Sequence, residues 1–248
     1  MTKIIIVYDG LGSCCSDDPR LPDVRHPLAE GGMSSSQSRT QYLAANEYGK
    51  EILQNICVGA GEREDVVFLI LPGVSIDARF DVKLIGEGAE ANIYGAYVCA
   101  GQEKVNIAVD MHHDVPHCNS RQLFKGVAGG NSRVDFYGKI IVAKDAQRTE
   151  AYQENHNLLL SDGAKVDTKP QLEIYADDVK CSHGATIGRL NEEEQFYMRS
   201  RGISLEDAKV LQMISFISPV LENIPDEAQR EEIAAGLESA IRKIVRAD

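Results

Sequence analysis

The chain has 248 residues, enough to bury a substantial core, and a net charge of -12 at pH 7 from 26 Lys and Arg against 38 Asp and Glu. Such an acidic chain lacks the clustered positive charge that binds nucleic acid or an anionic membrane surface. We therefore expect small molecules or other proteins as partners.

Two apolar runs are long enough to be considered as targeting or membrane segments: Ile4–Tyr8 near the N-terminus and Val66–Leu71, the longest later run. Both fall far short of the roughly 20 residues that cross a bilayer, and the first is also too short for a signal-peptide core. We expect a soluble, cytoplasmic protein. Its six cysteines form no CxxC pair, so we expect reduced thiols rather than a zinc ribbon or a ferredoxin-type cluster.

Residues 1–62 carry the weakest pattern. A short strand is expected at Lys3–Tyr8, and the Gly and Ser cluster at Gly31–Ser36 is typical of a flexible connection. Gln41–Asn55 is interpreted as a short helix, although its apolar residues do not keep a clean helical spacing. We expect either this segment or a dimer partner to cap the exposed strand edges of the region that follows.

Residues 63–188 consist of short β-branched and aromatic runs separated by Gly, Asn and Asp. Phe80–Ile85 and Val105–Val109 alternate with the period of two that strands require. Strand runs that recur every ~10–15 residues fit a sandwich, a barrel or a solenoid of stacked turns, and composition does not choose among them.

Residues 189–248 have a helical pattern. Asn191 and Ser204 are suited to cap two helices, and Gly202 to end the first in the left-handed conformation. Pro225-Asp226 begins a last helix. The apolar stripe from Leu205 to Leu221 is expected to pack into the core.

Two constellations could bind metal. Cys181 and His183 are two residues apart, so on a strand they leave the same face; the alternative is a half-buried thiol beside a core histidine. Asp110–Cys118 holds His112, His113, His117 and Cys118, donors that divalent metals prefer, but their spacing fits no standard zinc motif and a polar turn is the alternative.

Nucleotide-binding and hydrolase motifs are missing from the sequence. It contains no GxxxxGK[ST] phosphate loop, no GxGxxG after a strand, no G-x-S-x-G and no H-E-x-x-H. The chain is interpreted as a scaffold rather than an enzyme, and the runner-up hypothesis is a β-helix or cupin-like metal enzyme that uses His112, His113 and His117.

The block Thr168–Arg189, which contains the Cys181-Ser-His183 context, resembles the C-terminal core of the SufB/SufD family of Suf iron–sulfur cluster assembly proteins, and SufD more than SufB. The resemblance covers roughly residues 80–245. Further blocks in the family's order are Cys118–Val127, Phe136–Val142, Ala146–Ser161 and Phe196–Ser204.

The resemblance implies a mainly β fold, a right-handed parallel β-helix followed by a C-terminal α-helical segment. It also implies a non-catalytic scaffold subunit that pairs with SufB or with itself as a dimer, and that docks the SufC ATPase. His183 would lie at the assembly interface with Cys181 beside it, while His113 and Cys118 are weaker metal candidates.

The same resemblance implies that a transient iron–sulfur cluster forms in the complex and that the isolated chain holds no tightly bound cofactor. The helical segment would dock SufC. The candidate docking residues are Arg199, Arg201, Leu205 and Leu211, although the two arginines are also explained as charge that complements a helix end.

Overall fold

The computed structural model describes residues 2–8, 39–44 and 51–247. The expected connection at Gly31–Ser36, together with Cys14 and Cys15, lies outside these residues. The strands of the described part are β1 (Thr2–Tyr8), β2 (Arg39–Ala44), β3 (Glu51–Val58), β4 (Arg63–Ile70), β5 (Ile76–Leu84), β6 (Glu90–Cys99), β7 (Lys104–His113), β8 (Asn119–Ala128), β9 (Arg133–Val142), β10 (Glu150–Leu159), β11 (Lys165–Ile174) and β12 (Lys180–Arg189). The helices are α1 (Glu192–Ser200), α2 (Leu205–Leu221) and α3 (Glu227–Ala247).

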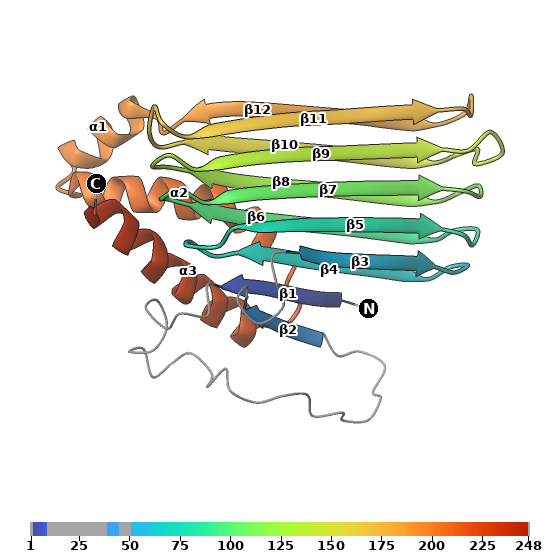
Figure 1. Cartoon of the computed structure of the whole chain (residues 1–248), viewed down its shortest axis with the longest axis horizontal. Coiled ribbons are helices and arrows are strands. Elements are labelled where there is room, and N and C mark those ends of the chain that lie inside the picture. The colour runs from blue at the N-terminus through green and yellow to red at the C-terminus, as the bar shows by residue number, and fades with distance from the viewer. Residues whose placement is uncertain (1, 9–38, 45–50, 248) are drawn as a thin grey trace.

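From β3 onward, successive strands alternate between two parallel sheets. One sheet has the order β12-β10-β8-β6-β4-β1-β2 and the other the order β11-β9-β7-β5-β3. Each strand pairs with the strand two further along the chain, so every turn lays one strand on each sheet (Figure 1). The parallel β-helix with a helical C-terminal segment, which the resemblance implies, is confirmed.

The interior between the two sheets is filled by the inward side chains of each turn. Along β5 buried and exposed residues alternate, as the period of two predicts. Phe68 meets Phe80 across the interior with ring centroids 5.1 Å apart, and Phe124 meets Phe136 at 4.8 Å. Each aromatic pair joins the two sheets within one turn, and together with the aliphatic side chains of the other turns the rings form a continuous apolar core.

Glycines make room for the largest of these side chains. A Cβ at Gly126 would lie 2.0 Å from Cζ of Tyr97, and a Cβ at Gly95 would lie 2.2 Å from the Phe124 ring. Tyr97 and Phe124 are fully buried, so neither ring has space to move aside. A small residue on one turn therefore permits a large one on the next.

A second core joins the helices to the outer face of the larger sheet. Val67, Leu69, Tyr94 and Val127 point outward from β4, β6 and β8 and pack against apolar residues of α2 and α3. This cover explains why β6 is buried on both faces, whereas β5 alternates. None of the described helices is long and apolar enough to span a bilayer.

The helix ends follow the predicted capping residues. Asn191 Oδ1 accepts hydrogen bonds from the backbone N–H groups of Glu193 and Glu194, and Ser204 Oγ accepts one from Asp207. Gly202 has φ of 89°, the left-handed conformation that ends α1. These predictions are confirmed.

Two expectations for the N-terminal part differ from the structure. The helix expected over Gln41–Asn55 is wrong, because β2 and β3 occupy the described portions of that range. In β3, Ile52 faces the core and Leu53 faces solvent, an alternation that a helical interpretation could not reveal. β1 and β3 also pair with β4 and β5, so the sheets begin N-terminal to the boundary expected at residue 63.

The glycine packing yields a stability prediction. Gly126→Ala should lower the free energy of unfolding by about 1–3 kcal/mol, because the new methyl group overlaps the Tyr97 ring. Gly184→Ala in β12 is the matched control, because its Cβ would meet nothing within 4 Å. Urea denaturation followed by circular dichroism measures both. Equal stability of the two variants would contradict the close packing at Gly126.

Candidate functional site

The last turn of the described solenoid, formed by β11 and β12, is open on one side. β12 pairs with β10 and β11 pairs with β9, and within the described residues neither has a second neighbour in its sheet (Figure 1). Side chains that would be enclosed in an inner turn are therefore exposed here. This end combines free backbone hydrogen-bonding groups with inward-facing side chains that solvent reaches.

Cys181 and His183 lie on the lumen side of this open turn. The register places Cys181 over Ala151 and His183 over Gln153, both of which are buried inward residues of β10. The prediction that the thiol and the imidazole share a face is confirmed. Residues two apart on a strand are separated by roughly 6.6 Å along it, so both side chains can reach one small ligand between or above them.

Exposure differs between the two donors. His183 is exposed, whereas Cys181 is half-buried and packs against the edge of the core. Burial raises the pKa of the Cys181 thiol, partly offset by a hydrogen bond with the backbone of Ala151. The thiol thus stays protonated at neutral pH until a cation approaches and favours the thiolate.

Buried amide side chains lie in the lumen below this turn. Gln153 Nε2 donates to Gln122 Oε1 at 2.8 Å, and Asn157 Nδ2 donates to Asn155 Oδ1 at 2.6 Å. The hydroxyl of Tyr97 also hydrogen-bonds Asn157 Oδ1. The apolar core of the inner turns therefore becomes polar towards the open end.

Several atoms of this polar region have no hydrogen-bond partner. They are Gln122 Nε2, Gln153 Oε1, Asn155 Nδ2 and Thr168 Oγ1. The backbone of Gly138 gives Gln153 its space, since a Cβ there would lie 2.0 Å from Gln153 Nε2. A buried polar atom left unsatisfied costs about 1–3 kcal/mol, so it marks a place where a further donor or acceptor would bind favourably.

The predicted cluster at Asp110–Cys118 is dispersed by the fold. His112 faces outward, 3.9 Å from Asp81 Oδ1, while His113 faces inward and is fully buried. His117 lies in the following turn at φ 62°, 3.9 Å from Glu87 Oε1. Adjacent strand residues point to opposite faces, so the three imidazoles that the metal-enzyme hypothesis requires are not brought together.

His113 and Cys118, the weaker metal candidates, are both buried. His113 Nε2 lies 2.8 Å from Ser120 Oγ, and the Cys118 thiol donates to the carbonyl of Gly86 at 3.4 Å. Burial lowers the pKa of His113 to about 4, with a further lowering by the charge of His112, and burial raises the pKa of Cys118. Among the described residues, no group of three or more His, Cys, Asp or Glu side chains could hold a metal ion.

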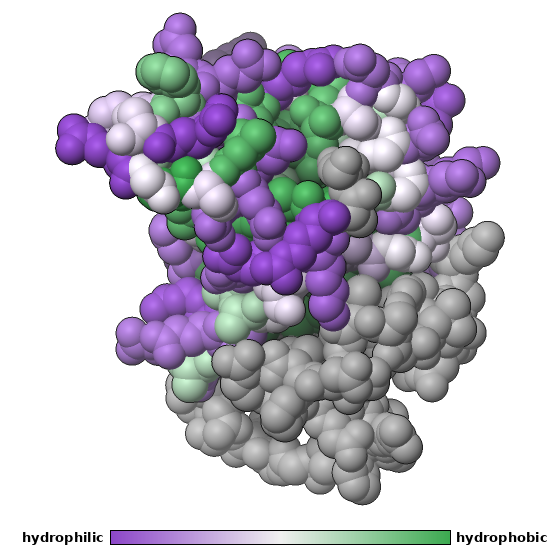
Figure 2. Space-filling view, turned by 90° about the vertical axis from the view of Figure 1, so that its left-hand side faces the viewer, coloured by the Kyte–Doolittle hydropathy of each residue, from purple (hydrophilic) through white to green (hydrophobic). Residues whose placement is uncertain are grey.

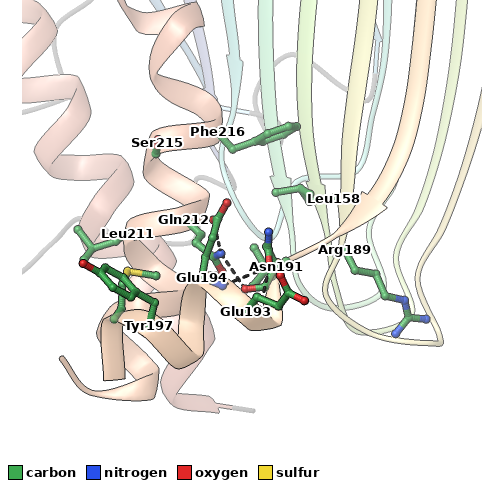
Figure 3. Close-up of a pocket in the computed structure, with 12 residues that line it drawn as sticks. Leu158, Arg189, Asn191, Glu193, Glu194, Tyr197, Leu211, Gln212, Ser215 and Phe216 are labelled. Carbon is green, nitrogen blue, oxygen red and sulfur yellow. Dashed lines mark hydrogen bonds between the residues drawn. The ribbon is translucent and has the colours of Figure 1, made fainter. Parts of the chain in front are cut away.

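A groove of about 810 Å³ separates α1 and α2 from the end of the larger sheet. Figure 3 shows Tyr197 and Leu211 close together at one end of the groove and Phe216 with Leu158 at the other. Gln212 ties the helices together by donating to Glu194 Oε2 at 2.8 Å and to the carbonyl of Asn191 at 3.0 Å.

The helical segment carries exposed apolar side chains. Tyr197 and Leu211, which line the groove, are 61% and 45% exposed, and elsewhere on α1 and α2 Phe196 is 73% and the predicted docking residue Leu205 41% exposed. Figure 2, which views the side that carries the helices, shows hydrophobic residues gathered in its upper half among hydrophilic ones. The guanidinium of Arg201 lies over the Tyr197 ring at 5.4 Å, and Arg199 is exposed in the last turn of α1.

The lumen amides were not predicted as site residues. In β10 the inward positions are occupied by Ala151, Gln153, Asn155 and Asn157, so no apolar alternation distinguishes the inner face from the outer one. The available signal was the run of Gln and Asn side chains at alternate positions of a strand.

Comparison with known proteins gives a family match over most of the chain. Residues 65–216 match the family model described as SUF system FeS cluster assembly, SufBD core domain. The chain is 40% identical over 166 residues to the iron–sulfur cluster assembly protein SufD of Escherichia coli, covering 67% of this chain and 39% of that protein.

Two further relatives have similar identity. A SufBD family protein of Synechocystis is 39% identical over 139 residues, which cover 56% of this chain and 31% of the relative. The chloroplastic protein ABCI7 of Arabidopsis thaliana is 38% identical over 152 residues, which cover 61% and 32%. The match thus spans less than half the length of each of these proteins.

The buried imidazole yields a pH prediction. Folding keeps His113 neutral down to about pH 4, whereas in the unfolded chain it takes up a proton below its ordinary pKa of 6.5. The free energy of unfolding therefore falls as the pH drops from about 6.5 to about 4, by about 1.4 kcal/mol per pH unit.

Urea denaturation of wild type and His113→Gln at neutral pH and near pH 5 isolates this contribution. Wild type should lose about 2 kcal/mol relative to the variant over that interval. His117→Asn is the control, because it removes an exposed imidazole at a position with positive φ that Asn tolerates. An identical pH dependence in wild type and His113→Gln would contradict the prediction.

Proposed function

The chain belongs to the SUF system FeS cluster assembly, SufBD core family, and we propose that it is a SufD-type scaffold subunit that helps to assemble an iron–sulfur cluster at its open solenoid end. In this role the chain performs no catalysis of its own. It supplies ligands and docking surfaces in a complex whose ATPase is a separate chain.

The observation that carries the proposal is the pairing of Cys181 and His183 at the open turn. Thiolate and imidazole are competent iron ligands, and iron in clusters commonly has four ligands. Two donors from this chain leave further positions to be filled by sulfide and by a second chain. An assembly site divided between two subunits opens and closes as the subunits move, which suits a cluster that must be released.

The partner at this end is a SufB homologue or a second copy of this chain. The free edges of β11 and β12 offer backbone hydrogen bonds, and Ile174, Tyr175 and Ile187 add apolar side chains that are 40–63% exposed. An exposed edge of this kind is stabilised when another strand or chain covers it. Cys181 and His183 would then lie inside the interface.

The helical segment is proposed to dock a SufC-type ATPase. The exposed apolar residues of α1 and α2 belong to the helical segment, which begins beside the end of β12, and not to the free strand edges of β11 and β12 (Figure 1). The ATPase is therefore assigned to the helical surface and the second scaffold subunit to the strand edges. ATP binding and hydrolysis in that subunit would move the helical segment and thereby reshape the interface at the open turn. The cluster is held in the complex, and the isolated chain retains none.

The assembly site is tested by co-purifying the chain anaerobically with SufB and SufC homologues. His183→Ala should leave complex formation intact but reduce bound iron and sulfide at least about 10-fold, because one donor is lost from a shared site. His112→Ala is the control, since it removes an imidazole from the outer face of β7. A complex that keeps its full iron and sulfide content after His183→Ala would refute the assignment.

The docking surface is tested separately. Leu211→Glu should weaken binding of the SufC-type ATPase at least about 10-fold, because it places a charge in an apolar contact. Leu53→Glu is the matched control, as Leu53 is 55% exposed on the smaller sheet. Calorimetric titration of the ATPase into each variant measures the difference. Equal loss in both variants, or in neither, would argue against docking at α2.

A further inference from the structure

The side chains of Gln153 and Gln122 form a hydrogen-bonded ladder along the lumen, and the two ends of this ladder are chemically different. Gln153 on β10 donates its Nε2–H to Oε1 of Gln122 on β8, one turn below. Gln122 Nε2 and Gln153 Oε1 remain without partners. The free donor is therefore at the inner end of the ladder and the free acceptor at the end nearer the open turn.

The position above the free acceptor is occupied by His183. Gln153 and His183 are in register on paired parallel strands, whose neighbouring side chains stack about 4.8 Å apart. In an amide ladder the carbonyl points away from the neighbour that receives the N–H, here towards β12. Gln153 is 1% exposed, so solvent does not satisfy this acceptor.

We propose that Gln153 is a positioning residue that accepts a hydrogen bond from one ring N–H of His183 and so fixes the tautomer and orientation of the imidazole. The lone pair of the other ring nitrogen then faces out of the lumen, where a metal ion or partner approaches. The inference rests on the proposed role of His183 and identifies the residue that prepares it.

Other donors near this acceptor do not compete. Thr168 on β11 is the remaining polar inward residue of the last turn, and its hydroxyl has no partner, so it is not bonded to Gln153. The His183 ring forms no hydrogen bond with any residue of the described part of the chain. The exposed ring is free to rotate into this bond, which would also remove the cost of an unpaired buried oxygen.

Nitrogen-15 NMR of histidine-labelled chain reports the tautomer of His183 directly, with no metal or partner present. One tautomer should predominate in wild type at alkaline pH. Gln153→Met keeps the length of the side chain but removes the acceptor, and should change the tautomer ratio about 5-fold, the factor expected for one hydrogen bond. Gln153→Glu should restore the ratio, because Gln122 can turn its unpartnered Nε2–H towards the carboxylate.

Asn155→Leu is the matched control. It removes another buried lumen amide of β10, with a similar loss of stability, but Asn155 lies under Ala185 rather than under His183. A tautomer ratio that is the same in wild type and Gln153→Met, or that shifts equally in Asn155→Leu, overturns the proposal. If the ratio shifts as expected while His183→Ala complexes keep their cluster, the assembly role fails and the positioning contact stands.

Discussion

Hydrogen bonding of each turn to the next is the constraint on which the rest of the structure depends. Parallel strands in register place equivalent side chains directly above one another, so a residue is constrained by its neighbours about 30 residues away as well as by its own strand. The first consequence is a lumen in which volumes must complement each other from turn to turn. The second is that the last turn of the described solenoid, formed by β11 and β12, exposes inward side chains that the inner turns enclose.

The lumen changes character along its length, and this change bears on function. In the inner turns phenylalanine rings pair across the lumen and glycines lie next to large side chains of the neighbouring turn, an arrangement that stabilises the fold but supplies no reactive group. Near β10 the same positions are held by Gln and Asn, whose unsatisfied atoms cost free energy. The open turn that carries His183 lies directly above these amides.

The helices cover part of the outer surface of the larger sheet and leave a groove beside the rest of it. α2 and α3 cover β4, β6 and β8, while the groove of about 810 Å³ remains between α1, α2 and the end of β10 and β12. Lys125 Nζ lies over the Phe216 ring at 4.6 Å and links α2 to β8 beside this groove. Through this contact α2 is connected to β8, which pairs with β10 below the open turn.

The sequence by itself determined what depends on nearby residues: the alternation in Phe80–Ile85 predicted a strand, and Asn191 predicted a helix start. Together with the resemblance, these patterns indicated the parallel β-helix. Only the tertiary structure decided that Gln41–Asn55 contributes strands, that His113 is enclosed in the lumen, and that His183 lies above an unpaired acceptor. The reason is physical: local pattern selects the element, whereas contacts between turns decide which face is enclosed and which side chains meet.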